Sequence, residues 1–140
     1  MKIHCLQHVS FEGPAAIAAW AEKNGHSIRY TRFYEGEHPP GTLDFDLLVI
    51  MGGPMSFDDD AHFDWMPAEK AFIKQAIEAN KAAIGICLGA QFLAQALGAQ
   101  ARHGSTQEIG WFPVSFHHLP EALQELPPVT PVFHWHGDTF

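Results

Sequence analysis

A cysteine stands midway between two glycines in the segment Gly85-Ile86-Cys87-Leu88-Gly89. The run 82–86 is short and apolar, as in a strand buried on both faces of a parallel sheet, and the residues after it are apolar at helical spacing. Strand, tight turn and helix therefore meet at Cys87, which is the arrangement of a nucleophile elbow. Glycine is expected on each side because a Cβ there would strike the backbone where strand and helix cross.

The expected position of Cys87 also bears on its reactivity. Unpaired amide N–H groups at a helix N-terminus favour the thiolate, and they can lower the pKa of a cysteine from about 8.5 towards 3.5–7.5. The alternative interpretation is a buried core cysteine whose neighbouring glycines are incidental.

A thiolate that attacks a carbonyl needs N–H donors aimed at the oxygen on which negative charge develops. In an elbow, the amide after the nucleophile, on Leu88, is one such donor. Gly52-Gly53 end an apolar strand at the same sheet edge, where their bare backbone can approach a substrate or simply form a turn. Gln91, one helical turn beyond Cys87, either reaches the same pocket or lies on the helix surface.

A cysteine nucleophile also needs a base, which is usually a histidine. His134 and His136 alternate on an expected strand and so point to one side, but each is expected to be structural or solvated, as are three further histidines: His103, His117 and His118. A His-x-His pair can ligate a metal, although the spacing gives no third ligand. We therefore expect no metal and no cofactor.

The elements that would position these residues alternate along the chain. Strands are expected near 3–9, 27–33, 47–51 and 82–86, and helices near 15–23, 68–79 and 88–97. This order predicts an α/β fold of three layers, with a mostly parallel central sheet flanked by helices. Beyond Gly98, strands near 101–103, 109–116 and 131–135, with a short helix near 120–126, predict an antiparallel extension packed on the main sheet.

Composition bounds the class of protein. The 140 residues, with 8 basic and 16 acidic side chains and a net charge of −8, predict a single domain spanning 1–140 that binds neither nucleic acid nor an anionic membrane. No apolar run approaches the ~18 residues that cross a bilayer. Two cysteines, Cys5 and Cys87, provide no disulfide framework, and the N-terminus does not read as a secretion signal. A cytoplasmic location is expected.

Four motifs, taken in order, resemble those of class I (triad-type) glutamine amidotransferases and are similar to the glutaminase domain of GMP synthase: Gly52-Gly53-Pro54, Gly85-Ile86-Cys87-Leu88-Gly89-Ala90-Gln91, Glu108-Ile109-Gly110-Trp111 and Trp135-His136-Gly137-Asp138. The resemblance implies the flavodoxin-like fold of that family. It also implies that Cys87 attacks the side-chain amide of glutamine, forms a glutamyl thioester and releases ammonia to a synthase domain or subunit. The Gly53 and Leu88 amides would form the oxyanion hole, and Gly52 and Gln91 would bind substrate.

The sequence departs from the family at one point. Family members carry the catalytic histidine and glutamate in a later Phe-His-Pro-Glu-like segment, which has no match before Phe140. Three explanations stay open: a shortened version of a longer protein, an inactive truncated product, or His134 or His136 as a substitute base. The domain is thus expected to be C-terminally truncated, and turnover without a base should fall by orders of magnitude. Two other functions also stay open, a cysteine hydrolase of the same fold and a non-catalytic domain.

Overall fold

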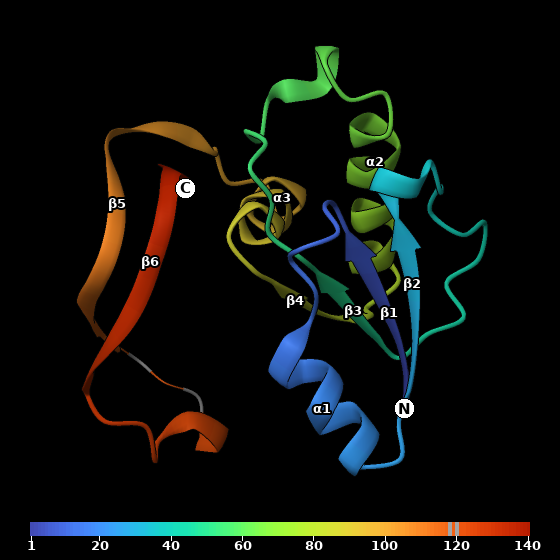
Figure 1. The fold of residues 1–140 in the computed structure, drawn as a ribbon. Coiled ribbons are helices and arrows are strands. Elements are labelled where there is room, and N and C mark those ends of the chain that lie inside the picture. The colour runs from blue at the N-terminus through green and yellow to red at the C-terminus, as the bar shows by residue number, and fades with distance from the viewer. Residues whose placement is uncertain (118, 120) are drawn as a thin grey trace. The chain divides into compact units, whose positions relative to one another are not determined.

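The computed structural model describes residues 1–117, 119 and 121–140 (Figure 1). In chain order its elements are β1 (Lys2–Gln7), α1 (Ala15–Lys23), β2 (Ser27–Arg32), η1 (Phe33–Glu35), β3 (Leu47–Ile50), η2 (Asp59–Ala61), α2 (Met66–Glu78), β4 (Ala82–Gly85), α3 (Leu88–Ala96), β5 (Arg102–Ser115), η3 (Glu121–Leu123) and β6 (Val129–Thr139). They form two compact units, Met1–Arg102 with Phe140, and His103–Thr139, and each unit is described by itself.

The first unit is built on a four-stranded sheet in the order β2-β1-β3-β4, in which every neighbouring pair is parallel. The register places Ile3 beside both Ile28 and Leu47, and Leu47 beside Ala82. Strands β1 and β3 are central and almost wholly buried, which explains their apolar runs. Because all four strands run the same way, their carboxyl ends meet at one edge of the sheet.

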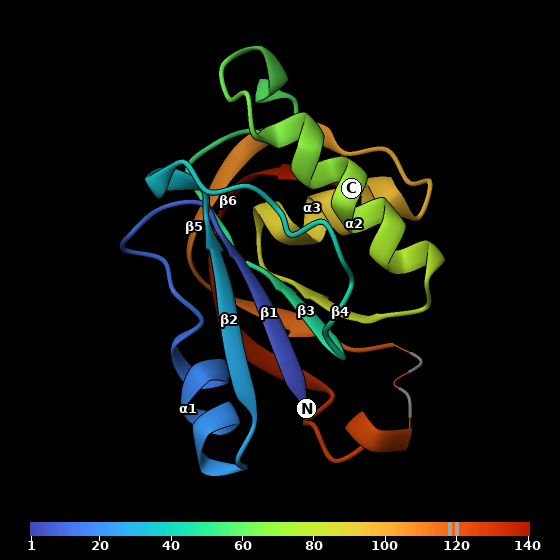
Figure 2. The same ribbon diagram turned by 90° about the vertical axis from the view of Figure 1, so that its right-hand side faces the viewer.

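Helices cover both faces of this sheet, which gives the predicted three layers (Figures 1 and 2). On one face, α1 packs over a small cluster of buried side chains: Ile3, Cys5, Ala21, Val49 and Met51. On the other face, α2 and α3 cover the larger cluster: Leu6, Phe33, Phe45, Leu48, Ile50, Phe57, Met66, Phe72, Ile73, Ala76, Leu88 and Phe92. The α/β architecture expected from the sequence is confirmed.

The second unit is a two-stranded antiparallel sheet of β5 and β6. The antiparallel strands expected towards the C-terminus are therefore present, but their bounds differ. The segments 101–103 and 109–116 belong to one continuous strand, and the strand expected at 131–135 extends over Val129–Thr139. The difference arises because β5 is exposed along nearly all its length, so no apolar alternation marks its middle.

The short helix expected near 120–126 is a single turn, η3, and Pro120 lies outside the described residues. The expected packing of this extension on the main sheet stays a prediction, as does a single domain over 1–140.

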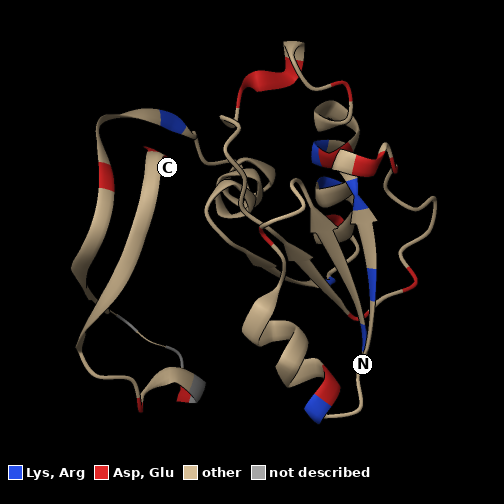
Figure 3. Ribbon diagram, in the orientation of Figure 1, with Lys and Arg blue, Asp and Glu red and all other residues tan. Residues whose placement is uncertain are grey.

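Acidic side chains gather at the tip formed by η2 and the residues before it, whereas Lys and Arg are scattered (Figure 3). Part of this acidic run has structural partners, because Asp59 accepts the Ser56 N–H at 2.8 Å and Asp60 pairs with Lys70 at 2.5 Å. None of the helices in the described part of the chain has both the length and the apolar character needed to cross a bilayer.

Candidate active site

Cys87 occupies the bend between β4 and α3. Strand β4 ends at Gly85 and α3 begins at Leu88, so Cys87 is the N-cap residue of that helix, and it is partly exposed. Its backbone has φ 51° and ψ −110°, a conformation that a side-chain-bearing residue rarely adopts. Such strain is sustained only where the surrounding structure enforces it, and it is frequent at nucleophiles.

The two flanking glycines enforce this bend by allowing close backbone contact. A Cβ built on Gly85 would collide with the carbonyl of Gly89, and a Cβ on Gly89 would collide with the carbonyl oxygen of Ile50. That same Ile50 oxygen accepts the N–H of Ile86 at 2.9 Å. The steric reason predicted for the glycines is confirmed: α3 lies against the end of β3 with no room for a side chain.

The structure brings Gly52 and Gly53 beside the elbow. A Cβ on Gly52 would lie 3.3 Å from Cys87 Cβ, and one on Gly53 would lie 3.6 Å from Leu88 Cδ2. The segment after β3 and the start of α3 therefore meet at the carboxyl edge of the sheet, where ligands bind in open α/β folds. The roles assigned to these residues stay predictions.

Gln91 lies in the first turns of α3 and is only 5% exposed. Its backbone N–H donates to the Cys87 carbonyl oxygen at 3.2 Å. The alternative that Gln91 is a surface residue of the helix is therefore wrong, because its side chain is covered by the fold. Its contact with a substrate stays a prediction.

Two functional candidates that the sequence analysis missed, His8 and Glu69, lie beneath this site. His8 follows the end of β1, and Glu69 is in the first turn of α2; the side chains of both are 0% exposed. His8 Nε2 lies 2.8 Å from Glu69 Oε1, and His8 Nδ1 lies 3.0 Å from the carbonyl oxygen of Gly52. One signal could have found His8, since in a parallel sheet the residue after β1 lies at the same edge as the residues after β3.

The electrostatics of this pair follow from burial. Desolvation raises the pKa of the Glu69 carboxyl, against the opposing influence of His8. Desolvation also opposes protonation of His8, but the hydrogen bond to Glu69 and the charge of that carboxylate outweigh it and raise the pKa of His8. Each group thus retains a proton more readily than in water, and the buried pair as a whole keeps one.

The downstream histidines belong to the second unit. Oε2 of Glu108 lies 2.8 Å from His134 Nδ1 and 3.2 Å from His136 Nε2. His103 bonds Asp138 at 2.9 Å, and His118 lies outside the described residues. Glu108, His134 and His136 offer three ligand atoms within 4.8 Å of one another and are the group that could hold a metal ion among the residues described. A catalytic role for His134 or His136 stays a hypothesis.

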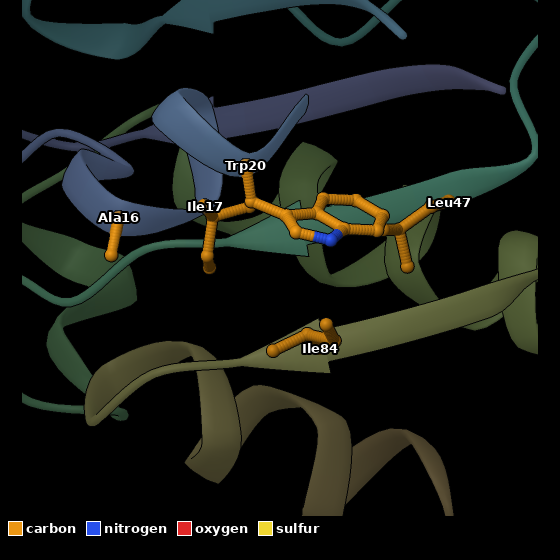
Figure 4. A pocket seen from close by; sticks show the side chains of 5 residues that line it. All are labelled: Ala16, Ile17, Trp20, Leu47 and Ile84. Carbon is orange, nitrogen blue, oxygen red and sulfur yellow. The ribbon is translucent and has the colours of Figure 1, made fainter. Parts of the chain in front are cut away.

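A separate pocket of about 330 Å³ opens on the α1 face of the sheet (Figure 4). Its lining side chains are all apolar: Ala16, Ile17, Trp20, Leu47 and Ile84. Glutamine carries an amide, an ammonium and a carboxylate, which need polar partners when they are desolvated. This pocket is therefore unsuited to glutamine, and the chemistry of the first unit is concentrated at the Cys87 edge.

Comparison with known proteins agrees with this geometry. The model of the family "Glutamine amidotransferase class-I" matches residues 16–140. The chain belongs to the class-I glutamine amidotransferase family. It is 40% identical to the glutamine amidotransferase-like protein YfeJ of Salmonella typhimurium, over 99% of this chain and 61% of that protein.

Solved structures of the family share the fold. A glutamine amidotransferase from Thermotoga maritima superposes with a TM-score of 0.93 at 29% identity, over 99% of this chain and 61% of that one. A GMP synthase subunit from Thermoplasma acidophilum, 24% identical with a TM-score of 0.68 over 99% and 65% of the two chains, shares the fold alone. This amidotransferase chain thus spans about three fifths of the length of the relatives it matches.

Proposed function

We propose that this protein releases ammonia from the side-chain amide of glutamine through a thioester on Cys87. The observation that carries the proposal is the strained, partly exposed Cys87 at the N-terminus of α3, set against Gly52, in a chain that matches the class-I family. In this reaction the thiolate forms a bond to the amide carbon, and the carbon–nitrogen bond breaks as the nitrogen leaves, protonated, as ammonia. Water then hydrolyses the thioester to glutamate and restores the thiol.

The amides of Gly53 and Leu88 are the proposed donors to the oxygen that becomes negative in the tetrahedral intermediate. Gln91 and the backbone at Gly52 would hold the glutamine. The base and its orienting acid are expected in the family's later Phe-His-Pro-Glu-like segment, so residues 1–140 by themselves supply the nucleophile and the oxyanion hole but not a complete triad.

The family match runs across both compact units, which supports assigning residues 1–140 to one amidotransferase domain. The proposed destination of the ammonia is a synthase domain or subunit, because a glutaminase carries no acceptor chemistry of its own. Two free cysteines and no disulfide among the described residues are typical of a reducing compartment, so we place the protein in the cytoplasm.

The test is covalent labelling of Cys87 by a diazoketone analogue of glutamine, followed by mass spectrometry of the digested chain. One label is expected, on Cys87, and free glutamine should protect against it. Cys87→Ala should abolish the label, whereas Cys5→Ala should leave it unchanged. Labelling that glutamine does not slow would overturn the proposal.

Turnover distinguishes the alternatives. Ammonia release from glutamine is measured beside peptide hydrolysis for residues 1–140 and for the longer protein that carries the later segment. The longer protein is expected to release ammonia, and residues 1–140 to do so orders of magnitude more slowly. Peptide hydrolysis that depends on Cys87 would favour a cysteine hydrolase, and no Cys87-dependent reaction in either form would favour a binding domain.

A further inference from the structure

The side chains of His8 and Glu69 form a polar pair with no solvent contact, directly behind the segment that contains the proposed oxyanion donor. A buried pair of this kind contributes little net stability, and removal of one partner leaves an uncompensated polar group. Oε2 of Glu69 has no hydrogen-bond partner among the described residues, so the pair is not built for maximal bonding. Its position suggests a role in the geometry of the site.

The proton positions follow from what each partner can do. The carbonyl oxygen of Gly52 can only accept, so His8 Nδ1, 3.0 Å away, must carry a hydrogen. His8 Nε2 and Glu69 Oε1 then share one proton over 2.8 Å, and the pair has no net charge whichever atom holds it. Glu69 therefore sets the His8 tautomer that donates to Gly52.

Packing holds the His8 ring in this orientation. The ring stacks against Phe33 at 5.6 Å and against Trp65 at 5.3 Å between centroids, and Phe92 meets its edge at 6.2 Å. These three aromatic residues come from η1, the residue before α2, and α3. Rotation of the imidazole would break both hydrogen bonds and this aromatic packing, so the donor to Gly52 is fixed in place.

The consequence falls on Gly53. The carbonyl of Gly52 and the N–H of Gly53 belong to one planar trans peptide, so they point in opposite directions. Holding the Gly52 oxygen towards His8 therefore directs the Gly53 N–H away from His8 and Glu69. The glycines also allow this peptide to lie close to both sides, with a Cβ on Gly53 3.2 Å from His8 Cβ and one on Gly52 3.3 Å from Cys87 Cβ.

We propose that His8, held by Glu69, is a positioning residue that orients the Gly52–Gly53 peptide so that its N–H serves the oxyanion of the Cys87 reaction; this rests on the function proposed above. The role is specific to reactions in which negative charge develops on oxygen. Alkylation of the same thiol forms no oxyanion and should not depend on it.

Two single-turnover reactions of Cys87 separate these effects without a complete triad. Acylation uses an activated γ-ester of glutamate, which passes through a tetrahedral oxyanion, and alkylation uses iodoacetamide, which does not. The double variant His8→Phe with Glu69→Met removes both polar partners and keeps the volume filled. Its acylation rate should fall by about 10²–10³-fold, the usual effect of losing one oxyanion donor, while alkylation stays within about threefold.

A folded double variant that acylates at the rate of the unmodified chain would overturn the positioning role, and so would an equal loss in both reactions, which indicates a general change at the thiol. Glu69→Gln can still hold the ring through Nε2 and is the matched control, with acylation expected within a few fold. If the double variant does not fold, Glu69→Ala replaces it, with a smaller but selective loss of acylation expected. Failure of the proposed function is distinguished separately, because glutamine would then not slow ester acylation in the unmodified chain.

A second, independent observation concerns the paired strands of the other unit. His134 and His136 alternate on β6 and share one side, and Glu108 on β5 faces both. His136 Nδ1 lies 3.2 Å from the Asp138 carbonyl oxygen, which can only accept, so Nδ1 carries a hydrogen. In the neutral ring, the Nε2 lone pair then faces Glu108 Oε2 at 3.2 Å, and two such acceptors need a cation between them.

We infer that Glu108, His134 and His136 bind a zinc-like divalent ion. A carboxylate with two imidazoles is a three-ligand set that leaves one position open, and a ring N–H held by a backbone carbonyl is the usual support of a metal-bound histidine. The sequence spacing gave only the two histidines; the pairing of β5 with β6 supplies the third ligand. The three atoms lie within 4.8 Å, and bonds of about 2.0–2.2 Å require them to approach to about 3.3 Å.

The test is calorimetric titration of residues 1–140 with zinc chloride in a Cys87→Ala background, which removes a competing thiolate. One equivalent should bind, and His134→Gln or Glu108→Gln should weaken binding at least tenfold. His117→Gln, outside the cluster, is the matched control and should bind as the parent does. No binding by the parent, or equal binding in all variants, would overturn the inference.

Discussion

His8 Nδ1 lies 3.0 Å from the carbonyl oxygen of Gly52, a residue 44 positions later in the chain. This hydrogen bond fastens the segment after β3 to the residue that follows β1, at the edge where Cys87 emerges. The segment that approaches the nucleophile is thus held by side chains from the core rather than by its own sequence. The predictions below concern this core, the elbow and the two thiols.

The His8–Glu69 pair makes stability depend on pH. Both pKa values are raised on folding, so the folded pair keeps one proton where the unfolded chain loses it. Stability is present below the ordinary His8 pKa of 6.5 and is lost as the pH rises above it, by at most about 1.4 kcal/mol per pH unit. Denaturant unfolding at pH 6.5–8.5 measures this slope.

The charged neighbours of the pair are Glu12, which faces His8, and Lys70, which faces Glu69. His4, whose pKa is lowered by burial, acts in the opposite direction but only below pH 6.5, so it does not enter this range. The double variant at His8 and Glu69 should show a flatter profile. A slope as steep as that of the unmodified chain would contradict the shared proton.

The two thiols should differ sharply in reactivity. Cys5 is 0% exposed on β1, and burial raises the pKa of its thiol to about 12, whereas Cys87 is partly exposed. Iodoacetamide at pH 7.5 should therefore label one cysteine in the folded chain and both in denaturant, as peptide mass spectrometry would record. Fast labelling of native Cys5 would contradict this prediction.

Gly89→Ala should destabilise the fold even though alanine is the better helix former by about 1 kcal/mol. The new Cβ would collide with the Ile50 carbonyl oxygen, and relieving that contact should cost about 1–3 kcal/mol in the free energy of unfolding. Gly41→Ala is the matched control, because open space surrounds it, and it should change stability by less than about 0.5 kcal/mol. Equal stability of the two variants would refute the steric account.

The strain at Cys87 should be measurable as stability. Glycine tolerates φ 51° with ψ −110° far better than alanine does, and a strained conformation costs about 1–3 kcal/mol. Cys87→Gly is therefore expected to unfold at higher denaturant concentration than Cys87→Ala, despite the extra chain entropy of glycine. At Ala90, inside α3, replacement by glycine should instead destabilise by roughly 1 kcal/mol. Cys87→Ala more stable than Cys87→Gly would mean that the backbone there is relaxed.

The sequence predicted the parallel layer well because its signals are local. Strand 47–51 is a continuous apolar run, and the bounds expected for the first helix, 15–23, are those observed. The elbow was predictable for the same reason, since glycine spacing and apolar periodicity agree around Cys87. The extent of β5 was not, because an exposed strand carries no burial pattern to mark it.

His8 and Glu69 were missed for a different reason. They lie 61 positions apart and meet only when α2 packs over the end of β1, so no spacing in the sequence relates them. Glu108 and the two histidines of β6 are likewise joined by strand pairing alone. Polar side chains that pair across the fold are visible only once the elements have a known arrangement.

The parallel strand order has a consequence for the timing of assembly. Each strand of the sheet is separated from its partner by a helix or a long connection, so every pairing closes a large loop and is slow to form. The bend at Cys87 depends on Ile50 and Gly89 meeting, and therefore comes late, after β3 has docked. A nascent or partly melted copy would carry an ordinary cysteine at this position, and recovery of its distinct thiol chemistry would time the last stage of folding.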